Sequence, residues 1–166
     1  MARATFTGLA YRQCHPDHTD LEATLRASRS FSFRFNRENE FGALYVALDR
    51  ATAVAELVRR ARLSSTPVQA YAPRALLTLR VRLRRVLDLS DPVIRRQWDI
   101  ALEDLQADDY LRCQEVAQVA RRQGYEAIRY PSATGEGENL AIFLDRLQPE
   151  SEVTIQEQEE LPLDSL

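Results

Sequence analysis

Five side chains in this sequence have the types that cleavage of a glycosidic bond beside a phosphate group requires. Glu56 offers a carboxylate that could stabilise a cation-like sugar in the transition state and grip a hydroxyl group. The guanidinium groups of Arg12 and Arg34 could form paired hydrogen bonds with phosphate oxygens. The ring of Tyr45 could stack on a planar base. The hydroxyl of Ser132 could bond to ribose, although the sequence offers it no evident activating base.

Each of these residues also has an ordinary structural interpretation. On a helical wheel Glu56 falls outside the apolar stripe, which is typical of a solvated residue paired with Arg60 one turn later. Tyr45 lies in an apolar segment and could be a core residue. The two arginines could be surface charges, and Ser132 could be a turn residue. Only their joint occurrence argues for a site.

Hydrophobic periodicity predicts the elements that hold these side chains. Strands are expected where apolar residues alternate or form short runs, at 5–12, 30–35, 43–48, 76–86, 126–130 and 140–144. Helices are expected at 19–28, 51–63, 92–105 and 110–123. Thr19 with Glu22, Asp49 and Pro92 mark helix starts, and Gly124 marks a helix end. This order predicts a mixed α/β or α+β domain around one sheet.

Length and composition favour one soluble domain. The chain has 166 residues, of which 45% are hydrophobic and 28% charged. No apolar run approaches the roughly 20 residues of a membrane span, and the first residues lack the apolar segment of a secretory signal. We therefore expect a cytoplasmic protein without a membrane partner. Cys14 and Cys113 are too few for a disulfide framework.

The basic residues are all arginine, which limits the chemistry. Without lysine, a Schiff-base lysine and a phosphate-loop lysine are both excluded. Acidic groups gather at the end, since residues 150–166 hold six acidic and no basic side chains while residues 1–149 carry a balance of +3. We expect Val153 and Ile155 to add a strand to the sheet before the chain frays. The predicted domain therefore spans 1–155, followed by an acidic, flexible tail over 156–166.

Three other functional classes find little support. Cys14, His15 and His18 do not make up the four ligands of a closed zinc site, so we expect no metal. With two histidines and no GxSxG elbow, a Ser-His-Asp hydrolase is disfavoured. Arg80 and Arg82 begin a basic ladder that could follow a nucleic-acid backbone, but a pI near 5.5 favours a solvated strand face.

Several short motifs follow one another in a specific order. They are Tyr11-Arg12, FRFN at 33–36, GALYVA at 42–47 running into AVAEL at 53–57, YPSA at 130–133 and ENL at 138–140. Together they resemble the RES-domain family, the toxin half of RES/Xre toxin-antitoxin pairs. The family takes its name from an Arg, a Glu and a Ser, which match Arg12, Glu56 and Ser132 here. The resemblance extends from about residue 5 to residue 153.

The resemblance implies an α+β fold similar to ADP-ribosyltransferases, with a mixed, mainly antiparallel sheet and flanking helices. It also implies a site that acts on NAD+. Family members degrade NAD+ with water or phosphate, or transfer ADP-ribose to a protein. By this resemblance NAD+ is the substrate and no resident cofactor is needed. The catalytic residues that the resemblance implies are Arg12, Glu56 and Ser132. The NAD+-binding residues that it implies are Arg12, Arg34, Tyr45 and Asn139, so Arg12 belongs to both sets.

The resemblance also implies partners. An antitoxin with an Xre-type helix-turn-helix domain is expected to neutralise the toxin, so that nucleic acid is contacted only through that antitoxin. A homodimer stays open. The acceptor of the ADP-ribosyl group stays open as well, because water, phosphate and a protein side chain all fit the family. A protein ADP-ribosyltransferase and a catalytically silent interaction module of similar fold are the alternatives to an NAD+-degrading toxin.

Overall fold

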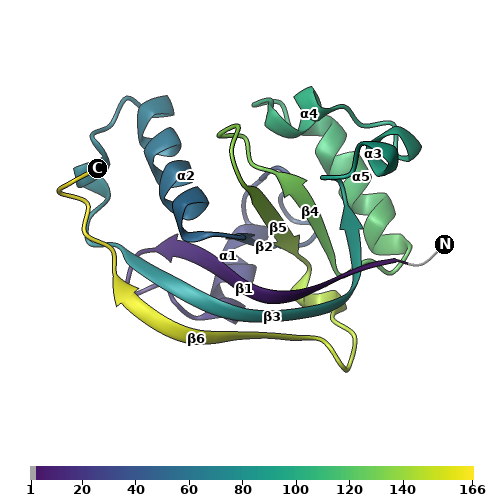
Figure 1. Cartoon of the computed structure of the whole chain (residues 1–166), viewed down its shortest axis with the longest axis horizontal. Coiled ribbons are helices and arrows are strands. Elements are labelled where there is room, and N and C mark those ends of the chain that lie inside the picture. Colours follow the sequence, from purple (N-terminus) through teal and green to yellow (C-terminus); the bar gives the residue numbers. More distant parts are fainter. Residues whose placement is uncertain (1–2) are drawn as a thin grey trace.

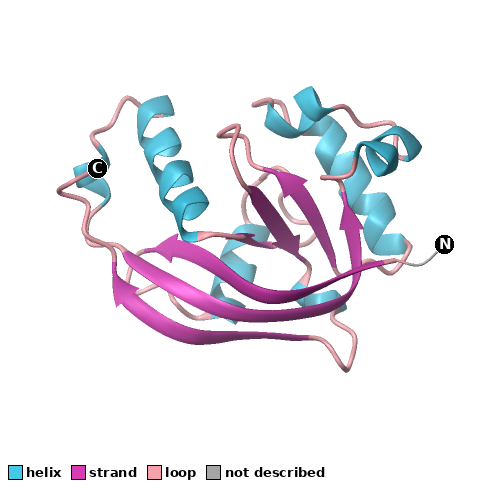
Figure 2. Cartoon of the chain, viewed as in Figure 1, coloured by secondary structure: helices cyan, strands magenta, loops and turns pink. Residues whose placement is uncertain are grey.

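The computed structural model describes residues 3–166, in which long strands carry helices on two sides (Figures 1 and 2). The strands are β1 (Ala4–Cys14), β2 (Leu44–Ala47), β3 (Ala75–Asp88), β4 (Ala127–Pro131), β5 (Glu138–Ile142) and β6 (Glu152–Glu160). The α-helices are α1 (Leu21–Arg29), α2 (Arg50–Leu63), α3 (Pro92–Gln97), α4 (Leu102–Gln106) and α5 (Leu111–Arg122), and the short 3-10 helices are η1 (Val68–Tyr71) and η2 (Leu144–Arg146). The mixed α+β class is therefore confirmed.

The sheet closes on itself. Its strand order is β1-β2-β5-β4-β3-β6, and an additional β1–β3 pairing joins the first five strands into a ring with β6 on its outside. Every neighbouring pair is antiparallel except β3 with β4. The mainly antiparallel character holds, but the simple sheet predicted from the sequence is corrected to a five-stranded barrel. Its weakest seam joins β1 to β2 through the single pair Tyr11 and Ala47.

A buried carboxylate stabilises the place where β3 changes partner. Along one edge β3 pairs first with β6 and then, at its end, with β4. Between these two segments Glu126 Oε1 accepts hydrogen bonds from the backbone N–H groups of Arg84 (2.8 Å) and Arg85 (2.9 Å). Its Oε2 accepts from the N–H of Gln148 at 2.8 Å. We call the place where β3 changes from β6 to β4 the fork of β3. Glu126 is fully buried there, and it supplies the hydrogen-bond acceptors that neither neighbouring strand offers.

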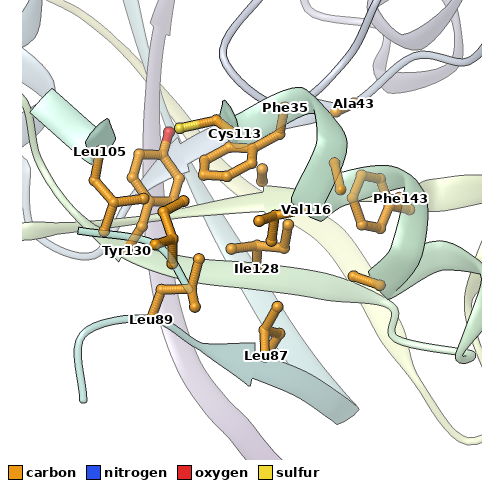
Figure 3. Close-up of a cluster of buried hydrophobic side chains, with 14 residues drawn as sticks. Phe35, Ala43, Leu87, Leu89, Leu105, Cys113, Val116, Ile128, Tyr130 and Phe143 are labelled. Carbon is orange, nitrogen blue, oxygen red and sulfur yellow. The ribbon is translucent and has the colours of Figure 1, made fainter. Parts of the chain in front are cut away.

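Two large apolar clusters fill the centre of the molecule, and a smaller third one joins α2 to the C-terminal segment. Inside the barrel, alternate β3 residues from Leu77 to Leu83 point inward and are fully buried, whereas the arginines between them are exposed, as the predicted alternation requires. The second cluster lies between α5 and the β4 side of the sheet (Figure 3). There Phe35 packs edge-on against Tyr130, with ring centroids 4.7 Å apart, close to Cys113 of α5. This second cluster connects the helices to the strands that carry the candidate site.

The predicted strand at 30–35 is wrong. The segment turns instead, with one isolated bridge between Phe33 and Asn36, and of its three phenylalanines only Phe35 is buried. The reason is the Asn36 side chain, whose Nδ2 donates to the carbonyl groups of Ser28 (3.0 Å) and Phe31 (2.9 Å). The Asn36 side chain thus makes the hydrogen bonds that a neighbouring strand would make. The alternating apolar pattern at 30–35 therefore occurs without strand pairing.

Two helix boundaries also differ from the prediction. The helix expected over 92–105 is divided into α3 and α4, because Asp99 takes a left-handed conformation with φ of 50°. The Arg112 side chain of α5 stabilises this break by donating to the carbonyl groups of Trp98 (2.8 Å) and Asp99 (3.0 Å). At the start of α1, the cap is Asp20 and not Thr19, since Asp20 Oδ1 accepts from the backbone N–H groups of the first turn.

The C-terminal segment differs from the expected frayed tail. The strand predicted around Val153 exists as β6, but β6 continues past residue 156 to its end at Glu160. Leu161 and Leu163 are then buried, at 5% and 4% exposure, in a cluster with Leu57 of α2. The basic ladder and the acidic segment do meet, since Arg82 pairs with Glu152 at 3.6 Å. This ion pair is exposed and contributes only about 0–1 kcal/mol, so apolar packing holds the segment.

Candidate functional site

A cleft of about 920 Å³ is lined by residues of β1, α1, β2 and α2. Its wall includes five of the six side chains predicted from the sequence, namely Arg12, Arg34, Tyr45, Glu56 and Asn139. The sixth, Ser132, is fully buried and connects to the cleft through a hydrogen bond to Glu56. The fold therefore gathers residues from five separate stretches of the chain around one cavity.

Glu56 lies at the centre of a hydrogen-bonded group. Its Oε1 accepts from the hydroxyl of Ser132 at 2.7 Å and from the side-chain amide of Asn139. Ser132 directly follows β4, whereas Asn139 belongs to β5, so the two neighbouring strands present their donors together. Among residues 3–166 no hydrogen bond involves Glu56 Oε2, which leaves that oxygen for a ligand in the cleft. The solvated Glu56 paired with Arg60, expected from the helical wheel, is not what the structure contains.

The loop between β4 and β5 is held directly on α2. Gly137 has a φ of +78°, and a Cβ built on it would lie 1.8 Å from Thr52 Oγ1 in the first turn of α2. Only glycine permits this approach. Within the loop, the N–H of Ser132 donates to the carbonyl of Gly137 at 3.0 Å, and Ser132 Oγ accepts from the N–H of Thr134 at 3.2 Å. These contacts fix the serine hydroxyl toward Glu56.

Arg12 is placed where β1 and β2 diverge. Its Nη1 donates to the backbone carbonyl of Tyr45 at 3.0 Å, just past the single pair that joins the two strands. Its Nε is buried and has no hydrogen-bond partner within the described chain. Burial lowers the pKa of the Arg12 guanidinium below its ordinary value, although nearby Cys14 opposes that shift. The side chain is therefore a partly buried, incompletely paired cation at the cleft.

Arg34 and Tyr45 make contacts that also build the cleft wall. Arg34 Nη1 donates to the carbonyl of Ala107 at 2.8 Å, and its guanidinium lies 4.7 Å from the ring centroid of Tyr110. Tyr45 donates its hydroxyl proton to Asn36 Oδ1 at 2.8 Å and accepts from the Phe35 N–H at 2.9 Å. Burial raises the pKa of Tyr45 far above its ordinary value, so the hydroxyl stays protonated. Both residues thus hold neighbouring segments in place besides facing the cavity.

Sequence reasoning gave no role to Tyr130, which also lines the cleft. Its side chain is 5% exposed, and burial together with the negative charge of Glu56 raises its pKa well above the ordinary value. Tyr130 belongs to the same short motif as Ser132, and this proximity in the sequence is the signal that could have identified it as a residue of the cleft wall. It is the last core residue of β4 before the site begins.

Within residues 3–166, no three histidine, cysteine, aspartate or glutamate side chains are grouped so as to hold a metal ion. The described helices include none with the length and apolar character needed to cross a membrane.

Comparison with known proteins decides the family. The family model described as RES domain matches residues 9–164, almost the whole chain. The chain belongs to the RES-domain family. Relatives of this RES chain include proteins named NAD(+) phosphorylase MbcT from Mycobacterium bovis and Mycobacterium tuberculosis, which are 29% identical over 124 residues. That alignment covers 74% of this chain and 67% of each relative.

A solved structure supports the fold of this RES domain. The crystal structure of the MbcT-MbcA toxin-antitoxin complex of M. tuberculosis contains a chain that superposes with a TM-score of 0.81 at 23% sequence identity. The match covers 96% of the RES chain and 87% of that chain. The fold of this chain is thus one that is seen in another protein.

Proposed function

We propose that this RES protein is an NAD+-consuming toxin of a toxin-antitoxin pair, which cleaves the bond between nicotinamide and ribose. The observation that carries the proposal is the carboxylate of Glu56, which two donors hold at the wall of a cleft that arginines also line. Family membership and relatives named NAD(+) phosphorylase support the same conclusion.

The proposed chemistry follows from the charges in the cleft. When the bond from ribose C1 to the nicotinamide nitrogen breaks, its electron pair leaves with nicotinamide, and positive charge builds up on the sugar. The carboxylate of Glu56 stabilises that charge, and its free Oε2 can accept a hydrogen bond from a ribose hydroxyl. Ser132 and Asn139 act as positioning residues, because both donate to Glu56 Oε1. Arg12, with its unpartnered Nε, binds the dinucleotide.

We propose phosphate as the acceptor ahead of water or a protein side chain. In phosphorolysis, a phosphate oxygen forms the new bond to ribose C1 while the bond to nicotinamide breaks, so ADP-ribose phosphate and neutral nicotinamide are released. The relatives named as phosphorylases favour this acceptor. No resident cofactor is required, because NAD+ itself carries the leaving group.

The partner is part of the proposal. We infer an antitoxin of the Xre type that covers the cleft, by analogy with the fold neighbour that was solved as a toxin-antitoxin complex. We further propose that the barrel is related to the ADP-ribosyltransferase fold. Expressing the toxin alone is expected to lower cellular NAD+ and stop growth, and harmless expression with NAD+ intact would contradict the toxin assignment.

Nicotinamide release from NAD+ by purified protein tests the enzymatic proposal. Release is expected with inorganic phosphate present, and Glu56→Gln is expected to lower the rate about a hundredfold or more, because it removes the negative charge that the transition state needs. Glu103→Gln is a matched control, since Glu103 is exposed on α4. Wild-type protein that is inert with water, with phosphate and with protein acceptors would overturn the proposal.

A further inference from the structure

Three arginines gather at one end of the cleft without a counter-charge. Arg12 comes from β1, Arg60 from α2, and Arg74 from the residue just before β3. Arg60 and Arg74 both lie over the ring of Tyr71, each 5.5 Å from its centroid. Arg12 and Arg60 line the cleft itself. We call these three side chains the arginine cluster.

The arginine cluster is not neutralised by the protein. Within residues 3–166, no carboxylate lies within 4.0 Å of any of the three guanidinium groups. The Nε atoms of Arg12 and Arg74 are buried and lack any hydrogen-bond partner in the described chain. Buried donors are nearly always paired in folded proteins, and a buried charge without a partner is costly. Two such donors in one cluster indicate that a ligand completes it.

The charges of the cluster act on one another. Burial lowers the pKa of Arg12, and the positive charges of Arg74 and Arg60 lower it further. Burial likewise lowers the pKa of Arg74, with Arg60 adding to the effect. Like charges that repel in a partly buried place are stabilised together by one anion between them.

We propose that Arg12, Arg60 and Arg74 form a binding subsite for a phosphate group. Guanidinium groups bind phosphate through paired, charge-assisted hydrogen bonds, and this cluster offers several unused N–H donors. The subsite rests on the proposed function for its natural ligand, which is either the pyrophosphate of NAD+ or free phosphate acting as acceptor. Anion binding itself can be measured without turnover.

Direct titration of the purified protein tests the subsite. Inorganic phosphate and inorganic pyrophosphate are titrated by calorimetry into wild type, Arg60→Gln and Arg74→Gln at constant ionic strength. Each substitution is expected to weaken anion binding about tenfold or more, because it removes a charged donor. Arg62→Gln, an exposed position on the same helix, is the matched control and is expected to bind as wild type does.

Folding is checked by thermal unfolding without anion. Arg60 makes no side-chain hydrogen bond or ion pair within the described residues, so Arg60→Gln is expected to fold even if Arg74→Gln does not. Wild-type protein that binds neither anion, or an Arg60→Gln variant that binds both as tightly as Arg62→Gln does, would overturn the subsite.

Turnover kinetics identify the source of the phosphate group. If the cluster holds the dinucleotide, Arg60→Gln raises KM for NAD+ about tenfold and leaves KM for phosphate unchanged. If it holds the acceptor, the same variant raises KM for phosphate and leaves KM for NAD+ unchanged. Equal values of both constants in Arg60→Gln and Arg62→Gln would count against the subsite. Absence of nicotinamide release from wild type would overturn the proposed function alone, because the anion titration still decides whether the subsite exists.

Discussion

Arg60 follows Glu56 by one turn of α2, yet the two side chains do not pair. Glu56 is bonded to Ser132 on the strand side, whereas Arg60 lies over the ring of Tyr71. Both face the cleft. One helix therefore presents a carboxylate and a cation to the same cavity without letting them neutralise each other. Under the proposed function, this separation lets the cleft bind a sugar beside Glu56 and a phosphate group beside Arg60.

The hydrogen bond from Ser132 to Glu56 is expected to matter for turnover. Ser132→Ala removes a donor that orients the carboxylate, so the rate of nicotinamide release should fall about 10- to 100-fold. Asn139→Ala should act in the same direction. Thr154→Ala, at an exposed position of β6, is the control. Unchanged rates in both site variants would mean that Glu56 needs no positioning.

Glu126 is expected to be a major contributor to stability. Glu126→Ala leaves three backbone N–H groups without their acceptor at the fork of β3, and the free energy of unfolding should fall by about 3–5 kcal/mol. Urea unfolding measures this change. Glu150→Ala, on an exposed loop, should cost less than about 0.5 kcal/mol. A loss of similar size in both variants would show that the fork does not depend on the buried carboxylate.

Asp145 is expected to make stability depend on acid pH. Its hydrogen bonds with Arg121, at 2.8 and 2.7 Å, lower the pKa of Asp145 below the ordinary value of 3.8. The contribution is therefore complete above about pH 4 and is lost as the pH falls through the lowered pKa of the folded state. Because the Asp145 side chain is 47% exposed, solvent screens the pair, and we expect about 1 kcal/mol.

Urea unfolding of Asp145→Asn from pH 7 down to about pH 3 measures this contribution. The variant should be less stable than wild type at pH 7, and the difference should shrink as acid protonates the wild-type carboxylate. Asp164→Asn, close to the C-terminus and exposed, is the control. A difference that stays constant across this range would exclude the Arg121 pair as its cause.

The end of the chain is expected to be required for both folding and activity. Deleting residues 157–166 removes Leu161 and Leu163, whose burial contributes about 1.5–3 kcal/mol each. Their cluster contains Leu57, the residue next to Glu56, so NAD+ turnover should fall as well. Deleting only residues 164–166 keeps both leucines and is the control. Equal thermal midpoints for the two truncations would show that this packing is dispensable.

Local patterns predicted most of the helices and strands, because those patterns report which face is buried. The alternation from Leu77 to Leu83 gave β3, and Gly124, with a φ of 84°, ended α5 as expected. The same rule failed at 30–35, where the Asn36 side chain supplies the hydrogen bonds that a neighbouring strand would have made. A period of two therefore indicated a strand where no partner strand exists.

The closure of the barrel and the hydrogen bonds of Glu56 both depend on residues that lie far away in the sequence. Nothing near residue 56 signals that its carboxylate meets donors at positions 132 and 139, since the helical wheel compares Glu56 only with its own helix. The family motifs identified the residue types, but not the contacts among them. Arg74 lies outside every motif, so no sequence pattern indicated that it is a neighbour of Arg12 and Arg60. Only the fold brings the three side chains together.

The order in which the site's parts are made has a consequence for the cell that produces this protein. Glu56 lies in the first half of the chain, but Ser132 and Asn139 follow much later, and the leucines that pack against α2 come last. Chains grow on the ribosome at roughly 5–20 residues per second and fold from the N-terminus. A nascent chain therefore cannot assemble the cleft until Ser132, Asn139 and the two leucines have been synthesised, so under the proposed function a partly made chain exposes the cell to no cleavage of NAD+.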